Sequence, residues 1–359
     1  MPQFAPASDD APPTALDEAS AAFSQAHPGV DVQVAVKPAR GDGGIAPFLA
    51  MTARVAPSAR PDLVVLPLDA FALPGLEGTL VPWEASADSA FDVFTYAAES
   101  VGLTADQAPS GLPFAVDIVH AVTRGSEPPG SWGGVADAAP FVLPAPSSDC
   151  IALSPLLAFY AASGGEIAAL PDASPDALDE SLAFVSTSVA DGVMVALPNA
   201  AESGASQVQS QLEAAATSAA VDAAQYVPVQ EAQPDWAWGP LPGPERPAPV
   251  IGCGWAFAVT ATDPDRAAVA RQLAEWLTDR ERRSWVVERG ALPADRTDWA
   301  ATVVDAVPAP PEAAYLAYLE AQLQAAVPIF SLDSWGGTFT DAYEQALAGE
   351  PSADAISTP

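Results

Sequence analysis

The sequence predicts an α/β protein that is built from two lobes. Near the N-terminus an amphipathic segment over 14–26 precedes the alternating VDVQVAV segment over 30–36, and a second helical pattern over 45–56 leads into the apolar run DLVVLPL over 62–68. Helices that alternate with strands in this way are typical of a mainly parallel sheet flanked by helices. The chain has 359 residues, of which 50% are hydrophobic, and that length favours two cores over one.

The middle of the chain continues this pattern less regularly. The segment LPFAVDIVHAV over 112–122 is rich in β-forming residues and longer than one compact sheet needs. We expect helices over 155–163, with Pro155 in the first turn, over 175–190, capped by Ser174, and over the Ala/Ser/Gln-rich 199–225, and then short strands around 226–229 and 236–241.

The last third of the chain returns to the initial pattern. The segment VIGCGWAFAVTA predicts a strand, and Asp263 with Pro264 begins a helix that carries one apolar stripe. Further helices are expected over 311–326 and 338–348. A chain that completes one lobe near residue 110, builds another and then returns indicates two lobes made of discontinuous segments.

Composition excludes several classes of function. With 13 Lys+Arg against 46 Asp+Glu, the formal net charge is -33, which disfavours nucleic acid and anionic membranes as partners. No apolar run is long enough to span a bilayer. The first residues lack the features of a secretion signal, and we interpret the chain as a mature form rather than a cytoplasmic protein.

Cysteine and histidine are scarce. Cys150 and Cys253 fit either a disulfide or two buried thiols, and their spacing is not that of a metal site. With only His27 and His120, a histidine-rich site cannot form. No phosphate-binding loop, nucleophile elbow or metal motif is present, so we expect no catalytic residue, no metal and no cofactor.

A series of short motifs resembles one known family. In chain order they are AAFSQAHPGVDVQV, RPDLVVLPLDAF, GTLVPW, SGLPFAVDIVHAVTRG, EPPGSWGGV, YAASGGEI, WGPLPGP, IGCGWAFAVTATDPDRAAVARQLAEWLTDRE and RGALPA. Their order and spacing are similar to those of the maltose-binding-like, sugar-type solute-binding proteins of ABC importers. Two segments depart from the family pattern: TSAAVDAAQYVPVQEAQ, and the crossing strand, which lacks the usual Tyr-Asn pair.

The resemblance implies a two-lobed periplasmic-binding-protein fold, with the lobes joined by a hinge. By matching positions, 1–112 and 256–308 would form the N-terminal lobe, and 113–255 and 309–359 the C-terminal lobe. It further implies hinge closure on a small ligand, delivery to ABC permease subunits, a monomer, and an extracellular or periplasmic location, with a lipoprotein tether in the full precursor as an option.

Aromatic side chains are the first candidates for ligand binding, because sugar rings have apolar faces. Trp255 lies between glycines in GCGW, and Trp335 precedes the last predicted helix; either could instead be a core residue. Trp238 shares a strand face with Trp236, and we expect at least one of these two to be buried.

Polar candidates follow or interrupt apolar strands, where an open α/β sheet presents its ligands. Asp69 follows one strand, and Asp117 interrupts another and needs a partner. The remaining candidates, at the end of the first segment and before a central helix, are Asp10 with its neighbours Ser8 and Asp9, and Ser148 and Asp149.

Other interpretations remain open at this stage. The many carboxylates permit a glycosidase, although nothing in the sequence selects an acid pair. A ligand sensor or interaction protein with the same fold is a third class. The charged segment 263–296 is either a solvated helix face with ion pairs or a surface that docks on a permease. We expect a neutral or cationic ligand, and above all a mono- or oligosaccharide.

Overall fold

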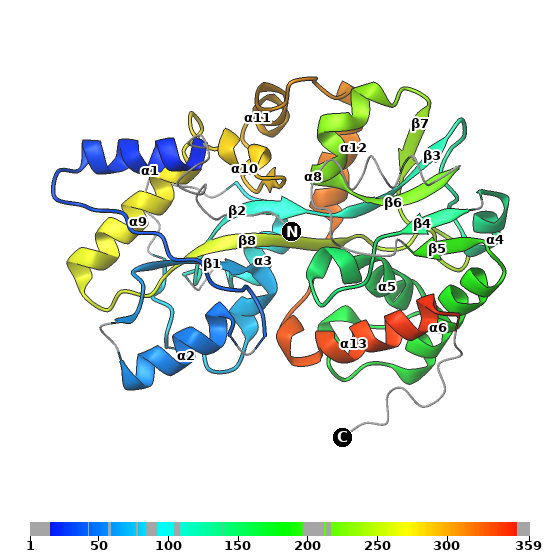
Figure 1. Cartoon of the computed structure of the whole chain (residues 1–359), viewed down its shortest axis with the longest axis horizontal. Helices are drawn as coiled ribbons and strands as arrows, with labels where there is room; N and C mark the ends of the chain where they lie inside the picture. Colours follow the sequence, from blue (N-terminus) through cyan, green and yellow to red (C-terminus); the bar gives the residue numbers. More distant parts are fainter. Residues whose placement is uncertain are drawn as a thin grey trace. The chain divides into compact units, whose positions relative to one another are not determined.

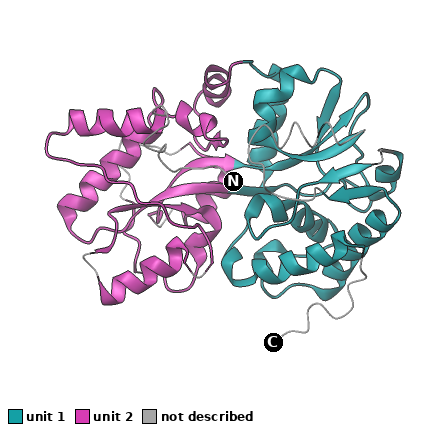
Figure 2. Cartoon of the chain, in the orientation of Figure 1, with its two compact units in different colours: residues 1, 117–253, 309–359 teal, residues 2–116, 254–308 magenta. Residues whose placement is uncertain are grey.

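The protein divides into two compact units, each made of discontinuous segments (Figure 2). In the computed structural model, the residues described are 15–41, 43–56, 59–76, 78–83, 92–103, 108–138, 140–196, 212 and 217–349. Unit 1 comprises residue 1, Asp117–Cys253 and Ala309–Pro359, and unit 2 comprises Pro2–Val116 and Gly254–Pro308. The chain therefore passes between the units after Val116, Cys253 and Pro308.

Unit 2 holds the first helices of the chain and the segment that follows the second crossing. Its elements are α1 (Ala15–Ala26), α2 (Ile45–Val55), β1 (Leu63–Pro67), the 3-10 helix η2 (Leu68–Ala72), α3 (Thr95–Ser100), β2 (Leu112–Asp117), most of β8 (Ile251–Val259), α9 (Pro264–Thr278), α10 (Ser284–Glu288), β9 (Leu292–Pro293) and α11 (Trp299–Ala306).

The sheet of unit 2 has the strand order β1-β8-β2-β9, with helices on both faces (Figure 1). Side chains alternate along each strand, so Val64 and Leu66 pack with Leu49 of α2, whereas Phe257 and Val259 pack against α1 and α9 on the other face. Both helices that the spacing predicted at 14–26 and 45–56, and the strand at 62–68, are thus present and supply this core.

Unit 1 contains the second sheet and the C-terminal helices. Its elements are β3 (Val119–Arg124), α4 (Trp132–Val135), η3 (Ala136–Ala138), β4 (Phe141–Leu143), α5 (Cys150–Ala162), η4 (Ile167–Ala169), α6 (Pro175–Ala190), β5 (Met194–Ala196), β6 (Ser218–Asp222), α8 (Ala223–Tyr226), η5 (Val227–Ala232), β7 (Trp236–Gly239), α12 (Ala313–Ala325), β10 (Val327–Pro328) and α13 (Leu332–Leu347).

The sheet of unit 1 has the strand order β5-β4-β6-β3-β7, with α5, α6 and α13 on one face and α8 and α12 on the other (Figure 1). Residues of β3 alternate between these faces. Val119 and Ala121 belong to the large apolar core with α5, and His120 contacts aromatic rings of α8 and α12. The sequence prediction of an α/β fold with helices flanking two sheets is confirmed.

The pairing of strands corrects one part of that prediction. Among the described pairs, β4 is parallel to β5 and β6, but β1–β8, β2–β9, β3–β6 and β3–β7 are antiparallel. The sheets are therefore mixed rather than mainly parallel.

Several local predictions were wrong, for identifiable reasons. The segment 30–36 forms no strand among the described residues, and Val34 and Val36 are exposed, so alternation there did not mark a buried face. The stretch 218–222, which we expected to be helical, is strand β6, and 226–229 is helical rather than extended. In 218–222 the small residues suit either structure, and pairing with neighbouring strands decides. Helix α5 also begins earlier than expected, so that Pro155 lies inside it.

The chain passes between the units for the second time at Cys253 and Gly254, and both residues are held in place. In unit 2 a Cβ at Gly254 would collide with the carbonyl oxygen of Ala115 and come within 2.8 Å of Leu68 Cδ1, so this position requires glycine. In unit 1 Cys253 forms a disulfide with Cys150, the first residue of α5, which resolves the choice that the sequence left open. No helix in the described part of the chain has the length and apolar character needed to cross a membrane.

Candidate functional site

The residue at the first crossing, Asp117, is a buried carboxyl group with only half of its hydrogen-bonding capacity used. Its side chain is 4% exposed. Oδ1 accepts hydrogen bonds from the backbone N–H groups of Ile118, at 2.8 Å, and Ala224, at 3.1 Å. Oδ2 is buried and has no hydrogen-bond partner among the described residues. A carboxylate left in this state is costly, so the site favours either a proton or a ligand donor at Oδ2.

The nearest titratable group to Asp117 is a second acid, Asp222, at the end of β6. Burial, and then the proximity of Asp222, raise the pKa of Asp117 well above its usual range. Burial also raises the pKa of Asp222. Because both pKa values are raised, the two neighbouring carboxyl groups favour a state in which one of them is protonated. We call Asp117 and Asp222 the carboxyl pair.

Asp222, a member of this pair, and Asp149 each cap a helix. Asp222 caps α8 by accepting from Gln225 N at 3.1 Å, and Asp149 caps α5 by accepting from Ala152 N at 3.0 Å. The charge of Asp149 also acts on Asp222, as the last of several causes that shift its pKa. The structure thus brings the predicted residues Asp117 and Asp149 into one group, and adds Asp222, which sequence reasoning missed.

Ser148 is the exposed neighbour of Asp149, in the loop that precedes α5. The hydroxyl of the preceding residue, Ser147, donates to Asp149 Oδ2 at 2.7 Å, and this contact holds the cap in place. The SSD tract that the sequence singled out therefore borders the carboxyl pair.

A group of aromatic side chains covers the opposite face of β3. Tyr315 of α12 hydrogen-bonds His120 Nε2 through its hydroxyl at 3.2 Å, and its ring lies 5.4 Å from that of Tyr226 and 5.1 Å from that of Trp238. Burial lowers the pKa of His120 to about 3, so this imidazole is neutral at physiological pH. Trp238, which we predicted as a ligand residue, is half-buried at the edge of this group, while Trp236 is buried.

Trp335, the second predicted aromatic ligand residue, lies in the core of unit 1. It is 4% exposed, its ring packs 5.0 Å from that of Phe339, and its Nε1 donates to the carbonyl of Phe330 at 3.0 Å. Trp335 is therefore a core residue, which is the alternative that the sequence left open. We do not include Trp335 in the proposed site.

The candidates of unit 2 gather at one end of its sheet. The register places Trp255 of β8 opposite Pro67, two residues before Asp69, and Trp255 is half-buried. Asp69 is 2% exposed and binds the guanidinium of Arg40 through both carboxylate oxygens, at 2.5 and 2.7 Å. Its charge is therefore compensated inside the protein. The remaining candidate, Asp10, lies outside the described residues, as do Ser8 and Asp9.

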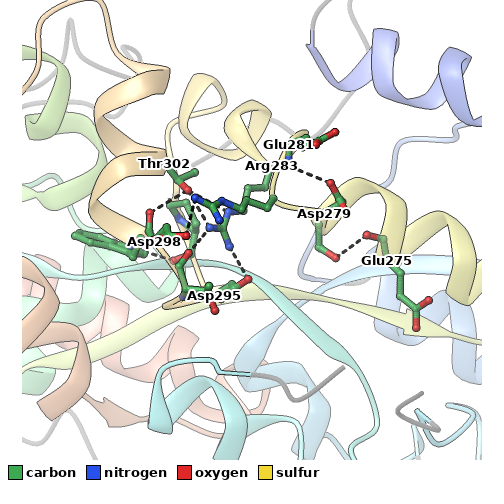
Figure 3. A network of polar contacts seen from close by, with 12 residues as sticks. Glu275, Asp279, Glu281, Arg283, Asp295, Asp298 and Thr302 are labelled. Atoms are coloured by element: carbon green, nitrogen blue, oxygen red, sulfur yellow. Dashed lines mark hydrogen bonds and ion pairs between the residues drawn. The ribbon is translucent and has the colours of Figure 1, made fainter. Parts of the chain in front are cut away.

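The charged segment 263–296 forms ion pairs that hold unit 2 together. Arg283 is the most buried of its basic residues, and Figure 3 shows its guanidinium directed toward Asp295 and Thr302. It also donates to the carbonyl of Thr297. Exposed ion pairs of the same unit are Arg266 with Asp62 and Arg280 with Asp298. These contacts fit the simpler of the two sequence interpretations, a helix face with ion pairs.

Charge is divided unequally between the two units. Unit 1 contains 23 Asp+Glu and only two basic residues, Arg124 and Arg246, a formal net charge of -21. Unit 2 contains the same number of acids but 11 basic residues, a net charge of -12. The buried acids of unit 1 therefore have few basic partners available, whereas Asp69 in unit 2 has one. Among the described residues, no cluster of His, Cys, Asp and Glu is arranged to hold a metal ion.

Solved structures share the fold of this chain over nearly its whole length. Maltose-bound MalE3 of T. maritima has a TM-score of 0.72 at 16% identity, over 95% of this chain and 93% of that one. The GacH receptor of Streptomyces glaucescens, solved unliganded and with acarbose, has a TM-score of 0.69 at 15% identity, over 95% and 92%. UgpB of Mycobacterium tuberculosis, in complex with glycerophosphocholine, has a TM-score of 0.63 at 15% identity, over 95% and 91%.

These neighbours are binding proteins, and the chain has their fold. The resemblance to solute-binding proteins that the sequence motifs indicated is confirmed at the level of the fold. No protein-family model matches the sequence, and a comparison with curated proteins finds no match.

Proposed function

We propose that this protein is the solute-binding subunit of an ABC importer and captures a small carbohydrate-type ligand. The observation that carries the proposal is the shared fold with MalE3, GacH and UgpB over more than nine-tenths of each chain. Because identity is only 15–16%, the ligand must be argued from the residues of this chain.

The side chains of the candidate site support a polar, uncharged or cationic ligand. In unit 1 the exposed Ser148, the half-buried Asp222 and the free oxygen of Asp117 offer hydrogen-bond acceptors, and carboxylates accept from sugar hydroxyls. In unit 2 the half-buried Trp255 offers a ring face for stacking. We propose Asp117, Asp149, Ser148 and Trp255 as ligand residues, with Trp238, Asp69 and Asp10 as secondary candidates.

The proposed setting is extracellular or periplasmic, with delivery to permease subunits after hinge closure of a monomer. The disulfide between Cys150 and Cys253 supports an oxidising compartment, because such bonds persist there and are rare in the cytosol. A lipid anchor on the precursor would keep the protein at the membrane.

A thermal-shift screen tests the proposal. The panel holds glucose, maltose, maltotriose, trehalose, the corresponding amino sugars, polyols and glycerophosphocholine. A specific ligand at ~100 times its Kd adds about 2.7 kcal/mol of stability, which raises the melting temperature measurably. At least one saccharide should produce this shift, with no turnover of aryl glycosides by the same sample. A shift with none of the saccharides would contradict the proposal, and turnover of an aryl glycoside would favour the glycosidase.

A further inference from the structure

The carboxyl pair of unit 1 is not neutralised by any basic side chain of its own unit. Arg124 stacks over the ring of Trp236, 5.0 Å from its centroid, at the far end of β3 from Val119 and Asp222. Five residues of strand separate Arg124 from Val119, roughly 16 Å at about 3.3 Å per residue. Arg246 is exposed in the turn after β7. Neither forms an ion pair with Asp117 or Asp222 in the described part of unit 1.

The atom that lacks a partner is well defined. Asp117 Oδ1 is occupied by two backbone N–H groups, and this fixes the plane of the carboxyl group. Oδ2, on a side chain that is 96% buried, is left with no donor among the described residues. An acceptor that is held in place, buried and without a donor from the described residues can accept from a ligand's N–H or O–H group.

We infer that the ligand of this site carries a protonated amine, as in an amino sugar, and that the amine binds the carboxyl pair at Asp117 Oδ2. This inference rests on the proposed function and specifies its ligand class. A charged donor is favoured over a hydroxyl, because a charge-assisted hydrogen bond is about twice as strong as a neutral one. The net charge of -21 on unit 1 adds a long-range attraction for a cation and none for a neutral sugar.

Binding of an amine should release a proton. Without ligand, the raised pKa values of both acids favour one proton on the carboxyl pair. An ammonium N–H that donates to Oδ2 takes the place of this proton, which leaves to solvent, and the ligand keeps its own protons and charge. The exchange turns two acids that share one proton into two carboxylates beside one cation. A neutral sugar can donate a hydroxyl hydrogen but cannot compensate the second negative charge.

The positive charge of the α-amino group lowers the pKa of Asp222, and the other groups around the pair do not change this proton count. Asp149 at the start of α5 adds negative charge and favours a cation. Tyr315 of α12 interacts with both acids and stays protonated, because burial raises its pKa well above the usual range. His120 of β3 is neutral, because burial lowers its pKa to about 3. The carboxyl pair, whose pKa values are raised, is thus the group from which a bound cation would displace a proton.

Isothermal titration calorimetry on the full chain tests this inference with matched ligands. The pairs are glucosamine with glucose, galactosamine with galactose, and the glucosamine disaccharide with cellobiose; N-acetylglucosamine serves as a neutral amide control. Each titration is run in two buffers that differ in ionisation enthalpy, at about pH 5.5 and about pH 7.0, where a primary amine stays largely protonated.

The expected result is that the amino member of at least one pair binds about tenfold or more tightly than its neutral partner. Its binding should release up to one proton and tighten as the pH rises. Asp117→Asn should abolish proton release and the preference for the amine. Asp341→Asn, which removes the same charge from an exposed position on α13 of the same unit, should keep both.

Two results would overturn the inference, and they differ in what they say about the proposed function. If a neutral sugar binds as tightly as its amino partner and no proton is released, the amine is not recognised, while the sugar-binding function stands. If neither neutral nor amino sugars bind, the carbohydrate function fails as well. Circular dichroism of Asp117→Asn shows that the variant is folded before its affinity is interpreted.

Discussion

Asp69 in unit 2 and Asp117 in unit 1 are nearly equally buried, at 2% and 4% exposed, yet they differ completely in their surroundings. Asp69 is held by the guanidinium of Arg40 through both oxygens. Asp117 faces a second acid and keeps one oxygen unused. Asp69 of unit 2 therefore forms a structural ion pair, whereas Asp117 of unit 1 is a candidate hydrogen-bond acceptor for a ligand.

The charge of each unit explains this difference. Unit 2 has 11 basic residues and uses them for ion pairs around Asp69, Asp295 and other acids. Unit 1 has two basic residues for the same number of acids, so its buried carboxyl groups rely on backbone N–H groups and on a shared proton. Its crossing strand is instead fastened by a covalent bond, the disulfide to α5.

The largest effect is expected from removing the partner of Asp69. Arg40→Met leaves a carboxylate buried without its cation, and breaking a buried pair in this way costs about 3–5 kcal/mol. The measurement is urea unfolding followed by circular dichroism and tryptophan fluorescence. Arg54→Met, which removes a cation from an exposed position on α2 of the same unit, is the control and should change stability little.

A second variant shows whether Asp69 needs its cation. Arg40→Met combined with Asp69→Leu removes both charges and should recover much of the loss, because the unpaired charge rather than the missing contact is the main cost. If the double variant is as unstable as Arg40→Met alone, Asp69 is not the reason for the destabilisation and the comparison with Asp117 loses its basis.

The disulfide of unit 1 should have the next largest effect. Cys150 and Cys253 are separated by 103 residues, and replacing both by serine frees a long loop in the unfolded chain. The expected loss is about 2–4 kcal/mol in the free energy of unfolding. Wild-type protein in dithiothreitol should unfold at the same urea concentration as the Cys150→Ser, Cys253→Ser variant. Equal stability of oxidised and reduced wild-type protein would contradict this role.

Much of the fold was predictable, because long amphipathic and apolar segments have one reasonable interpretation. The helices at 14–26 and 175–190 and the strand at 62–68 follow from spacing and caps, and Ser174 does accept from Ala177 N at 3.4 Å. The strand at 218–222 was missed because SAAVD is made of small residues whose strand character comes from pairing with β3 and β4.

The candidate site was predictable only in part. Asp117 was identified because a charge within an apolar strand must have a partner, and Asp149 because it precedes a helix. Asp222 was missed, since it lay within a segment that we took for a helix, although an aspartate that follows SAAV and precedes AAQ has the pattern of a strand end and a helix cap. The ion pair between Arg40 and Asp69 could not be predicted from the sequence. The two residues are 29 positions apart, and only the packed fold brings them together.

The most specific effect, which depends on pH, is expected from Asp117→Asn. Since burial and Asp222 raise the pKa of Asp117 in the folded protein above its ordinary value of 3.8, the folded state holds a proton that the unfolded state has lost. The resulting stability is fully present below pH 3.8 and is lost as the pH rises toward the folded pKa, by at most about 1.4 kcal/mol per pH unit for one proton.

Asparagine keeps an acceptor for Ile118 and Ala224 and donates to Asp222 at every pH. The variant should therefore match wild type below pH 3.8, become more stable than wild type as the pH rises above that value, and show a flatter dependence of unfolding free energy on pH. Asp341→Asn should keep the wild-type slope, and an unchanged slope in Asp117→Asn would show that Asp117 is already ionised in the folded protein.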